Sequence, residues 1–168
     1  GANTVAIGEQ AFASGGNTRA TGSYTHAEGN FTTASNSAAH AEGYYSVASG
    51  LYSHAEGNNT LASNNSSHAE GYLATASGTY SHAEGQQTLA SGVASHAEGL
   101  STVALGTYSH ASGYGTIASG SSQTVVGKFN SRGDASSLFI VGNGSGDNDA
   151  FRSDGLDRKS TRLNSSHE

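Results

Sequence analysis

The chain has 168 residues, of which 34% are hydrophobic and 12% are charged, and it contains 24 Gly but no Pro, Cys, Met or Trp. Ordinary globular domains hold about 45–50% apolar residues, so large apolar side chains are too few here to fill a conventional core. The lack of cysteine excludes disulfide scaffolds and thiolate metal sites. No apolar run has the roughly 18 residues of a transmembrane helix, and the formal charge of −6 argues against nucleic acid as a partner.

The charges divide the chain into two parts. Residues 1–127 contain seven Glu and a single cation, Arg19, whereas residues 128–168 contain six cations and six acids. We therefore expect residues 1–127 to form one structural unit and residues 128–156 to form a separate, β-rich cap or neck.

Residues 1–127 consist of one short repeat. The tetrapeptide His-Ala-Glu-Gly begins at six positions that lie 14 residues apart, and it returns once as His-Ala-Ser-Gly. A second motif lies between these copies, as in Leu89-Ala90-Ser91-Gly92, so the underlying period is seven. Of the 18 half-repeats, 17 carry Ala at the second position, and 16 end in Gly while two end in Asn.

A seven-residue period also occurs in coiled coils, but this repeat does not fit a helix. A heptad needs two apolar positions, and each Gly in a helix interior costs about 1 kcal/mol. Gly and Asn adopt left-handed backbone conformations at low cost, so the repeat predicts alternating strands and turns. We expect an all-β parallel β-roll, or solenoid, of nine 14-residue coils with two strands each, forming a rod about 40 Å long.

The alternation of side chains along a strand assigns the repeat positions to two faces. In Ser53-His54-Ala55-Glu56-Gly57, the His and Glu side chains point away from Ser53 and Ala55. The uniformly small Ala and Ser/Thr positions favour a closely packed interior, with His and Glu outside. The alternative places Val, Leu, Ile and Thr inside, facing His and Glu.

A single roll of this kind buries little apolar surface against the entropy cost of ordering the chain, which is about 1–2 kcal/mol per residue. With Ala inside, a stripe of larger apolar residues is left on the outside, and stripes of this kind usually mark interfaces. We therefore expect a symmetric oligomer that packs the stripes together. The stripe consists of Val47, Leu61, Leu89, Val103 and Ile117.

The repeat resembles the head repeats of trimeric autotransporter adhesins, the YadA-like family. Residues Asn3-Thr4-Val5-Ala6-Ile7-Gly8 are close to the family consensus Asn-Ser-Val-Ala-Ile-Gly. The Ser-His-Ala-Glu-Gly variant, together with Leu138-Phe139-Ile140-Val141-Gly142-Asn143-Gly144, is similar to fibre proteins of Gram-positive bacteria and their phages. The resemblance covers about residues 3–156. It implies a left-handed parallel β-roll, a homotrimer, and an extracellular, cell-surface or virion-surface location.

The function implied by the resemblance is a structural or adhesive fibre segment that attaches to a host protein or glycan. The segment belongs to a surface-exposed trimeric adhesin or a phage tail fibre. The alternatives are a spacer in a phage tail or neck appendage, without receptor binding of its own, and a metal- or pH-responsive His/Glu scaffold. We expect no enzyme activity, since near-copies of one His/Glu pair along a rod do not make a single specialised pocket. We also expect no cofactor, no nucleic-acid partner and no membrane insertion by this segment.

The His and Glu ladders are the first candidate site. Glutamates about 4.8 Å apart repel one another by about 1 kcal/mol per neighbouring pair in water and by several at lower dielectric. We expect the histidine of the same coil, such as His26 beside Glu28, to supply counter-charge, with part of the His ladder protonated near neutral pH. A solvated or interface hydrogen-bonding ladder is the favoured interpretation, and metal binding is the alternative.

The ladder comprises two sets of side chains and six candidate metal ligands. The ladder histidines are His26, His40, His54, His68, His82, His96 and His110. The ladder glutamates are Glu28, Glu42, Glu56, Glu70, Glu84 and Glu98. The candidate metal ligands are His54, Glu56, His68, Glu70, His82 and Glu84.

Three further features carry expectations. The glycines that end the His-Ala-Glu-Gly copies are predicted at turns, and they are Gly29, Gly43, Gly57, Gly71, Gly85, Gly99 and Gly113. An aromatic residue on every second coil forms either edge packing or a binding strip for a sugar or protein, and the four are Tyr24, Tyr52, Tyr80 and Tyr108. Residues 157–168 match no fibre pattern and resemble translated sequencing-adapter DNA, so we expect a non-native tail on a truncated reading frame.

Overall fold

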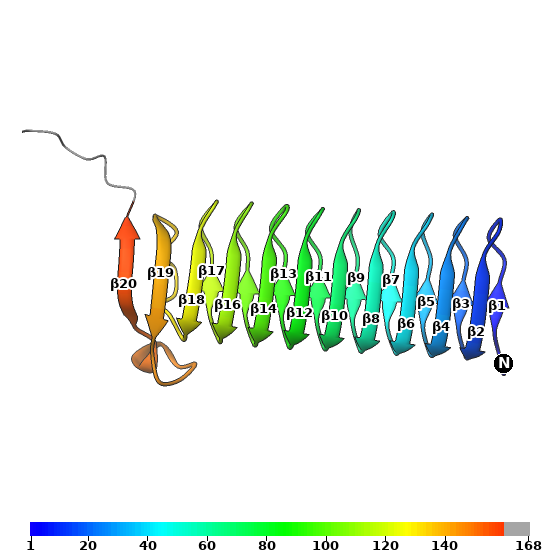
Figure 1. Cartoon of the computed structure of the whole chain (residues 1–168), viewed down its shortest axis with the longest axis horizontal. Coiled ribbons are helices and arrows are strands. Elements are labelled where there is room, and N and C mark those ends of the chain that lie inside the picture. Colours follow the sequence, from blue (N-terminus) through cyan, green and yellow to red (C-terminus); the bar gives the residue numbers. More distant parts are fainter. Residues whose placement is uncertain (160–168) are drawn as a thin grey trace, which may run out of the picture.

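The chain folds as a rod of stacked coils, seen from the side in Figure 1. The computed structural model describes residues 1–159, with side chains through residue 156. Each 14-residue coil contributes one strand of five residues and one strand of two residues. The predicted all-β parallel solenoid of 14-residue coils is confirmed, although the second strand of each coil is shorter than expected.

The long strands carry the His-Ala-Glu-Gly copies and their equivalents, and the short strands carry the motif between them. The long strands are β2 (Phe12–Gly16), β4 (His26–Asn30), β6 (His40–Tyr44), β8 (His54–Asn58), β10 (His68–Tyr72), β12 (His82–Gln86), β14 (His96–Leu100), β16 (His110–Tyr114) and β18 (Thr124–Lys128). The short strands are β1 (Val5–Ala6), β3 (Arg19–Ala20), β5 (Thr33–Ala34), β7 (Val47–Ala48), β9 (Leu61–Ala62), β11 (Thr75–Ala76), β13 (Leu89–Ala90), β15 (Val103–Ala104) and β17 (Ile117–Ala118). They are followed by β19 (Ser137–Asn143), the 3₁₀-helix η1 (Asp149–Phe151) and β20 (Asp154–Lys159).

The long and the short strands form two separate sheets, and within residues 1–128 both are parallel. Each strand pairs with its copy in the next coil without a shift, so that His68 pairs with His82 and Ala69 with Ala83. Because neighbouring strands lie about 4.8 Å apart, every side chain stacks on the equivalent residue of the next coil.

Small side chains fill the space between the two sheets. The Ala of every half-repeat from Ala20 to Ala118 is fully buried, and so is the Ser, Thr or Ala two residues before it. The predicted interior of Ala with Ser/Thr is therefore confirmed. The alternative, with Val, Leu and Ile inside, is wrong, because those side chains lie on the outer face of the short-strand sheet, where they are exposed or half-buried.

Most of the buried hydroxyl groups fall into two classes. Before the long strands, Ser53 donates to the carbonyl oxygen of Gly50 and Ser81 donates to that of Gly78, both at 2.7 Å. Before the short strands, the Thr hydroxyl is often buried without a hydrogen-bond partner among the described residues, as at Thr60 and Thr88. At these positions Thr contributes its shape, because a β-branched side chain suits a strand and its methyl group packs in the interior.

The seven glycines predicted at turns lie instead near the ends of the long strands, with φ between +99° and +111°. A Cβ atom at Gly57 would lie 2.2 Å from the carbonyl oxygen of Gly71, so the stacking distance and the backbone conformation both require Gly. The turns themselves use other residues in the left-handed region, such as Tyr52 with φ 57° and Asn59 with φ 56°. The backbone N–H groups of these two residues donate to carbonyl oxygens of the preceding coil. These hydrogen bonds offset the backbone strain of about 1–2 kcal/mol.

Two amide side chains close the C-terminal end of the roll. Gln123 stands at the last Ser/Thr position, where it accepts from the amide of Ser119 at 2.8 Å and donates to the carbonyl of Ser137 at 2.7 Å. The Asn130 side chain bonds to the amide and the carbonyl of Ile117, at 2.7 and 3.0 Å. Asn130 thus supplies the hydrogen bonds that a further strand would make to the backbone of Ile117 at the edge of the short-strand sheet.

Beyond the roll, the long-strand sheet continues for two more strands. Strand β19 pairs in parallel with β18, and β20 pairs antiparallel with β19. The side chain of Arg152, only 3% exposed, donates to the carbonyl oxygens of Gly115 and Asn130 and so fixes the η1 segment to the last coils. Residues 157–159 of the predicted non-native tail continue β20, and residues 160–168 of it lie outside the described residues.

The two classes of hydroxyl predict opposite responses to mutation. Ser81→Ala removes a buried hydrogen bond and should lower the free energy of unfolding by about 1 kcal/mol. Thr88→Val keeps the shape of the side chain and removes a buried hydroxyl that has no partner among the described residues. It should leave stability unchanged or raise it. Chemical denaturation of both variants measures the difference, and a larger loss for Thr88→Val would contradict this account.

Candidate functional site

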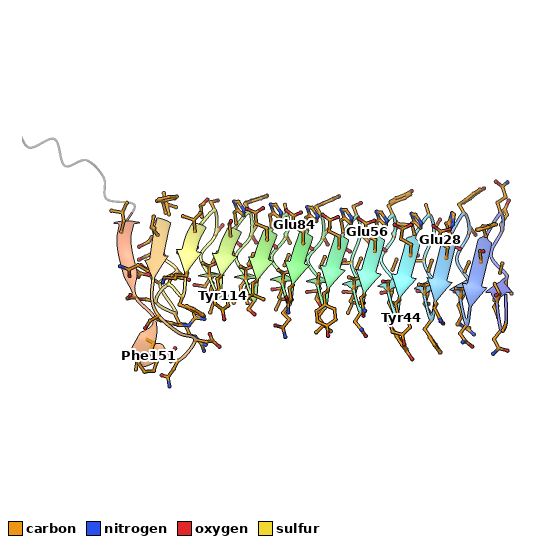
Figure 2. All side chains as sticks on the ribbon, turned by 60° about the horizontal axis from the view of Figure 1, so that its bottom comes forward. Glu28, Tyr44, Glu56, Glu84, Tyr114 and Phe151 are labelled. Atoms are coloured by element: carbon orange, nitrogen blue, oxygen red, sulfur yellow. The ribbon has the colours of Figure 1, made fainter. Side chains whose placement is uncertain are left out.

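The outer surface of the long-strand sheet, here called the His/Glu face, carries the two ladders. In each long strand from β4 to β14, His is the first residue and Glu is the third, so both side chains point away from the interior. Figure 2 shows Glu28, Glu56 and Glu84 in a row along one side of the rod, with Tyr44 and Tyr114 along the other side. The structure thus brings the predicted ladder residues together on one face.

The histidines form a continuous stack. From His40 to His110, neighbouring imidazole rings lie 4.6–4.9 Å apart between centroids, with interplanar angles of at most 4°. The ring spacing matches the strand spacing, because each ring sits on its copy in the next coil. At the N-terminal end Phe12 continues the stack and meets His26 edge-on.

The contacts between His Nε2 atoms and Glu carboxylates change register along the rod. His26 pairs with Glu28 of its own strand at 3.4 Å, and His40 pairs with Glu42 at 3.7 Å, as the sequence predicts. From His68 onward each histidine instead pairs with the glutamate of the preceding coil, at distances of 3.2–3.8 Å. The prediction of same-coil pairing is therefore wrong for this half of the ladder. The later pairs connect neighbouring coils.

The glutamates have little other counter-charge. In residues 1–156, every ion pair of the ladder carboxylates within 4.0 Å involves histidine. The Gly beside each Glu leaves an open groove along these two strand positions, first from Ser14 to Gly71 and again from Glu84 to Gly113. Because the carboxylates line this groove, it is a negatively charged channel on the surface.

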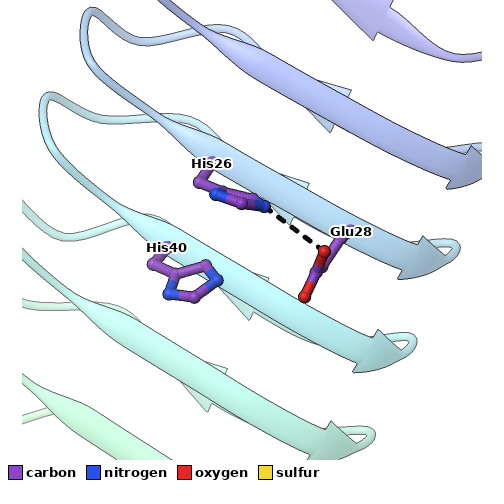
Figure 3. A group of neighbouring side chains, drawn as sticks. All are labelled: His26, Glu28 and His40. Atoms are coloured by element: carbon purple, nitrogen blue, oxygen red, sulfur yellow. Dashed lines mark ion pairs between the residues drawn. The ribbon is translucent and has the colours of Figure 1, made fainter.

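The ladder also forms a series of mixed clusters. Figure 3 shows the first, in which His26 and His40 of neighbouring coils flank Glu28. The next four clusters are Glu–His–Glu triads, and in each of them one potential ligand atom per residue lies within 4.8 Å of the others. The triads are Glu42/His54/Glu56, Glu56/His68/Glu70, Glu70/His82/Glu84 and Glu84/His96/Glu98. All six candidate metal ligands named from the sequence belong to this series.

Burial lowers the pKa of His40 and His68, and the neighbouring histidines in the stack lower it further. For His40 the opposing groups are Glu42 and Glu28, which raise the pKa by less. The lowered pKa favours the neutral form of these two imidazoles near pH 7. The expectation that part of the ladder is protonated stays a prediction.

The tyrosine strip named from the sequence lies along one edge of the rod. Tyr24, Tyr52, Tyr80 and Tyr108 occupy the turns before long strands and are 55–66% exposed. Successive rings lie two coils apart, or about 9.6 Å, because Ala38, Ser66 and Ala94 occupy the turns between them. None of the four rings stacks on another aromatic ring among the described residues. Their faces are open to solvent.

A second aromatic edge was not predicted. Phe31 and Tyr45 occupy turns after long strands and stack with centroids 4.6 Å apart, and Tyr44 meets Tyr45 edge-on. Tyr72 and Tyr114 lie at the same strand position as Tyr44 and are exposed. These positions vary from coil to coil, so the repeat does not reveal them. In the sequence, only the adjacent Tyr44-Tyr45 pair indicates an aromatic cluster on this edge.

The lowered pKa values predict that acid destabilises the roll. A group with a pKa lower in the folded than in the unfolded state stabilises the fold above the unfolded value, and this stability is lost as pH falls through the folded value. The melting temperature should therefore fall as the pH is lowered from about 7 to about 5, because protonation places charges beside His26, His54 and His82.

Circular dichroism melts in a chelator measure this effect. His40→Gln/His68→Gln should flatten the pH dependence, and Tyr24→Ser/Tyr52→Ser is the control that leaves the histidines unchanged. Equal slopes in the two variants would contradict the assignment of the effect to the His stack.

The roll geometry agrees with a known repeat family. The YadA head domain repeat matches residues 1–25, 38–63, 69–95, 83–109 and 97–122, which together are more than half of the chain. A search of curated proteins finds no match. The matched segments share the 14-residue coil, the Ala interior and the parallel stacking described above. The chain therefore belongs to the YadA head domain family, whose repeats form the heads of trimeric autotransporter adhesins.

Proposed function

We propose that the chain is a rigid segment of a trimeric, surface-exposed fibre, in an adhesin or a phage tail fibre, that mediates attachment to a host or another surface. Family membership supports an adhesin-like structural fibre segment, and YadA-like adhesins are surface-exposed homotrimers. The family is generally non-enzymatic, and the regular series of His/Glu clusters suits a structural role. Within residues 1–159 no helix is long and apolar enough to span a membrane.

The observation that carries the trimer is the outer face of the short-strand sheet. The interior of one roll holds mainly Ala, Ser and Thr, so a single chain buries few large apolar side chains. The larger aliphatic residues lie outside in one row, where Val47, Leu61 and Leu89 stand in successive or alternate coils. Burying this row against two further copies would remove it from water and add the apolar contact that the interior lacks.

Light scattering of the full chain at several concentrations tests this proposal. We expect about 50 kDa, three times the 16.8 kDa of one chain. Leu61→Ser/Leu89→Ser/Val103→Ser should lower the mass toward one chain, because it places hydroxyl groups in the apolar contact.

The matched control is Tyr52→Ser/Tyr80→Ser/Tyr108→Ser, which alters an edge instead of the sheet face and should keep the trimer mass. If the unmodified chain is a folded monomer at every concentration, the proposed trimer is wrong.

The tyrosine strip favours a role in attachment over that of a passive spacer. Tyrosine presents an apolar ring and a polar hydroxyl group, a combination that suits sugar and protein surfaces. The four exposed rings repeat along a rigid scaffold, so they offer several equivalent contacts to one extended ligand.

Binding of the chain to an array of glycans and host-surface proteins distinguishes a role in attachment from that of a passive spacer. On any ligand found, Tyr24→Ser/Tyr52→Ser/Tyr80→Ser/Tyr108→Ser should reduce the affinity about tenfold or more. Tyr44→Ser/Tyr72→Ser/Tyr114→Ser changes the opposite edge and should bind like the unmodified chain. Equal losses in both variants would exclude the strip as the contact, and a chain that binds nothing on the array would favour the spacer.

A further inference from the structure

The His/Glu face offers a periodic set of ligands in which each site combines one ring nitrogen with two carboxylates. In the triads centred on His68, His82 and His96, the Nε2 atom lies 3.8, 3.4 and 3.2 Å from the nearer glutamate oxygen. Two ligand atoms bound to one Zn²⁺ at about 2.0–2.1 Å each lie about 3.3 Å apart in tetrahedral geometry. One nitrogen–oxygen pair in each of these triads is thus already near the spacing of a zinc site, and all the ligand atoms of a triad lie within 4.8 Å of one another.

Two further observations point to a cation at these triads. The Nε2 atoms of His54, His68 and His82 are shielded from solvent and make no hydrogen bond among residues 1–156, although a glutamate oxygen lies near two of them. In the fourth triad, His96 Nε2 already has a hydrogen bond with Glu84 at 3.2 Å. The ladder carboxylates lie on successive coils, and in the same part of the chain no Lys or Arg pairs with them. A metal ion between ring and carboxylates would give the nitrogen a partner and reduce the repulsion along the ladder.

We propose that the Glu–His–Glu triads of residues 42–98 bind divalent transition-metal ions, with Zn²⁺ as the representative. The nitrogen ligand decides the class of metal, because Ca²⁺ and Mg²⁺ prefer all-oxygen sites whereas Zn²⁺ binds imidazole and carboxylate together. The side chains that form the triads remain about one-third exposed, so ions reach them from the groove. This proposal does not depend on the trimer, since every ligand comes from one chain.

Sharing of carboxylates sets the number of ions. Neighbouring triads have one glutamate in common, and one divalent ion balances the charge of two carboxylates. Alternate triads, such as Glu42/His54/Glu56 and Glu70/His82/Glu84, share no ligand. We therefore expect two ions per chain at saturation across the four triads, instead of one for every coil.

Isothermal titration of the untagged full chain with zinc chloride, after dialysis against a chelator, measures the affinity and the number of ions. Glu56→Gln/Glu84→Gln removes one ligand from each of the four triads and should weaken zinc binding about tenfold or more. Glu9→Gln/Asp149→Asn makes the same charge change away from all five clusters and should keep the affinity within about twofold. Replacing Glu56 and Glu84 by Gln relieves like-charge repulsion in the ladder, and Glu9 and Asp149 are exposed, so both variants are suited to folding.

A second variant separates the histidine ligands from the acidic ladder. His54→Gln/His68→Gln/His82→Gln/His96→Gln keeps every carboxylate and should lose zinc affinity by a similar factor. Visible absorption of the Co²⁺ form gives a second readout, because its bands report nitrogen ligation and low coordination number. Melting curves in chelator check that each variant is folded.

Three outcomes would overturn the proposal. The first is no zinc binding at about 100 µM. The second is equal isotherms for Glu56→Gln/Glu84→Gln and its control Glu9→Gln/Asp149→Asn. The third is displacement of zinc by an equal concentration of Ca²⁺, which would indicate a carboxylate effect alone. Light scattering of the same samples in chelator keeps a failure here distinct from a failure of the proposed trimer.

Discussion

The spacing of about 4.8 Å between hydrogen-bonded strands decides which side chains each position of this repeat can carry. Because the register never shifts in the roll, each residue must be compatible with a copy of itself at that distance. Ala meets the condition inside, and Gly meets it where a Cβ would strike the next carbonyl oxygen. Imidazole meets it as a stack of parallel rings. Tyrosine is spaced two coils apart in the turns, which keeps the rings clear of one another.

The same constraint makes the roll thin. Two sheets separated by Ala, Ser and Thr leave no room for large side chains, so hydrogen bonds between coils provide much of the order and the larger apolar residues remain outside. A fold of this kind gains from association with other copies, and its outer faces are repetitive surfaces. The C-terminal end shows how the repeat can stop: Asn130 imitates a missing strand, and Gln123 and Arg152 tie the following segment to the last coils.

Electrostatics oppose this regularity on the His/Glu face. A repeat that places one glutamate on each coil also places its charge at the stacking distance from the next. The lowered pKa of His40 and His68 favours their neutral form, so these two rings offer little counter-charge to the glutamates near pH 7. The ladder therefore concentrates negative charge on one face, which is the basis of the proposed metal binding and of the predicted pH dependence.

The sequence alone determined the period, the parallel solenoid and the small-residue interior, because stacking of identical positions turns a linear repeat directly into a spatial one. It also identified the two ladders and the strip of Tyr24, Tyr52, Tyr80 and Tyr108. Only the tertiary structure decided the partner of each histidine, since the sequence does not show whether a side chain leans toward its own coil or the preceding one. The structure likewise placed Gly57 in a strand and other left-handed residues in the turns. The position of Gly depends on how close the backbone of the next coil lies. The second aromatic edge, around Tyr44 and Tyr45, also needed the structure, because those positions do not repeat.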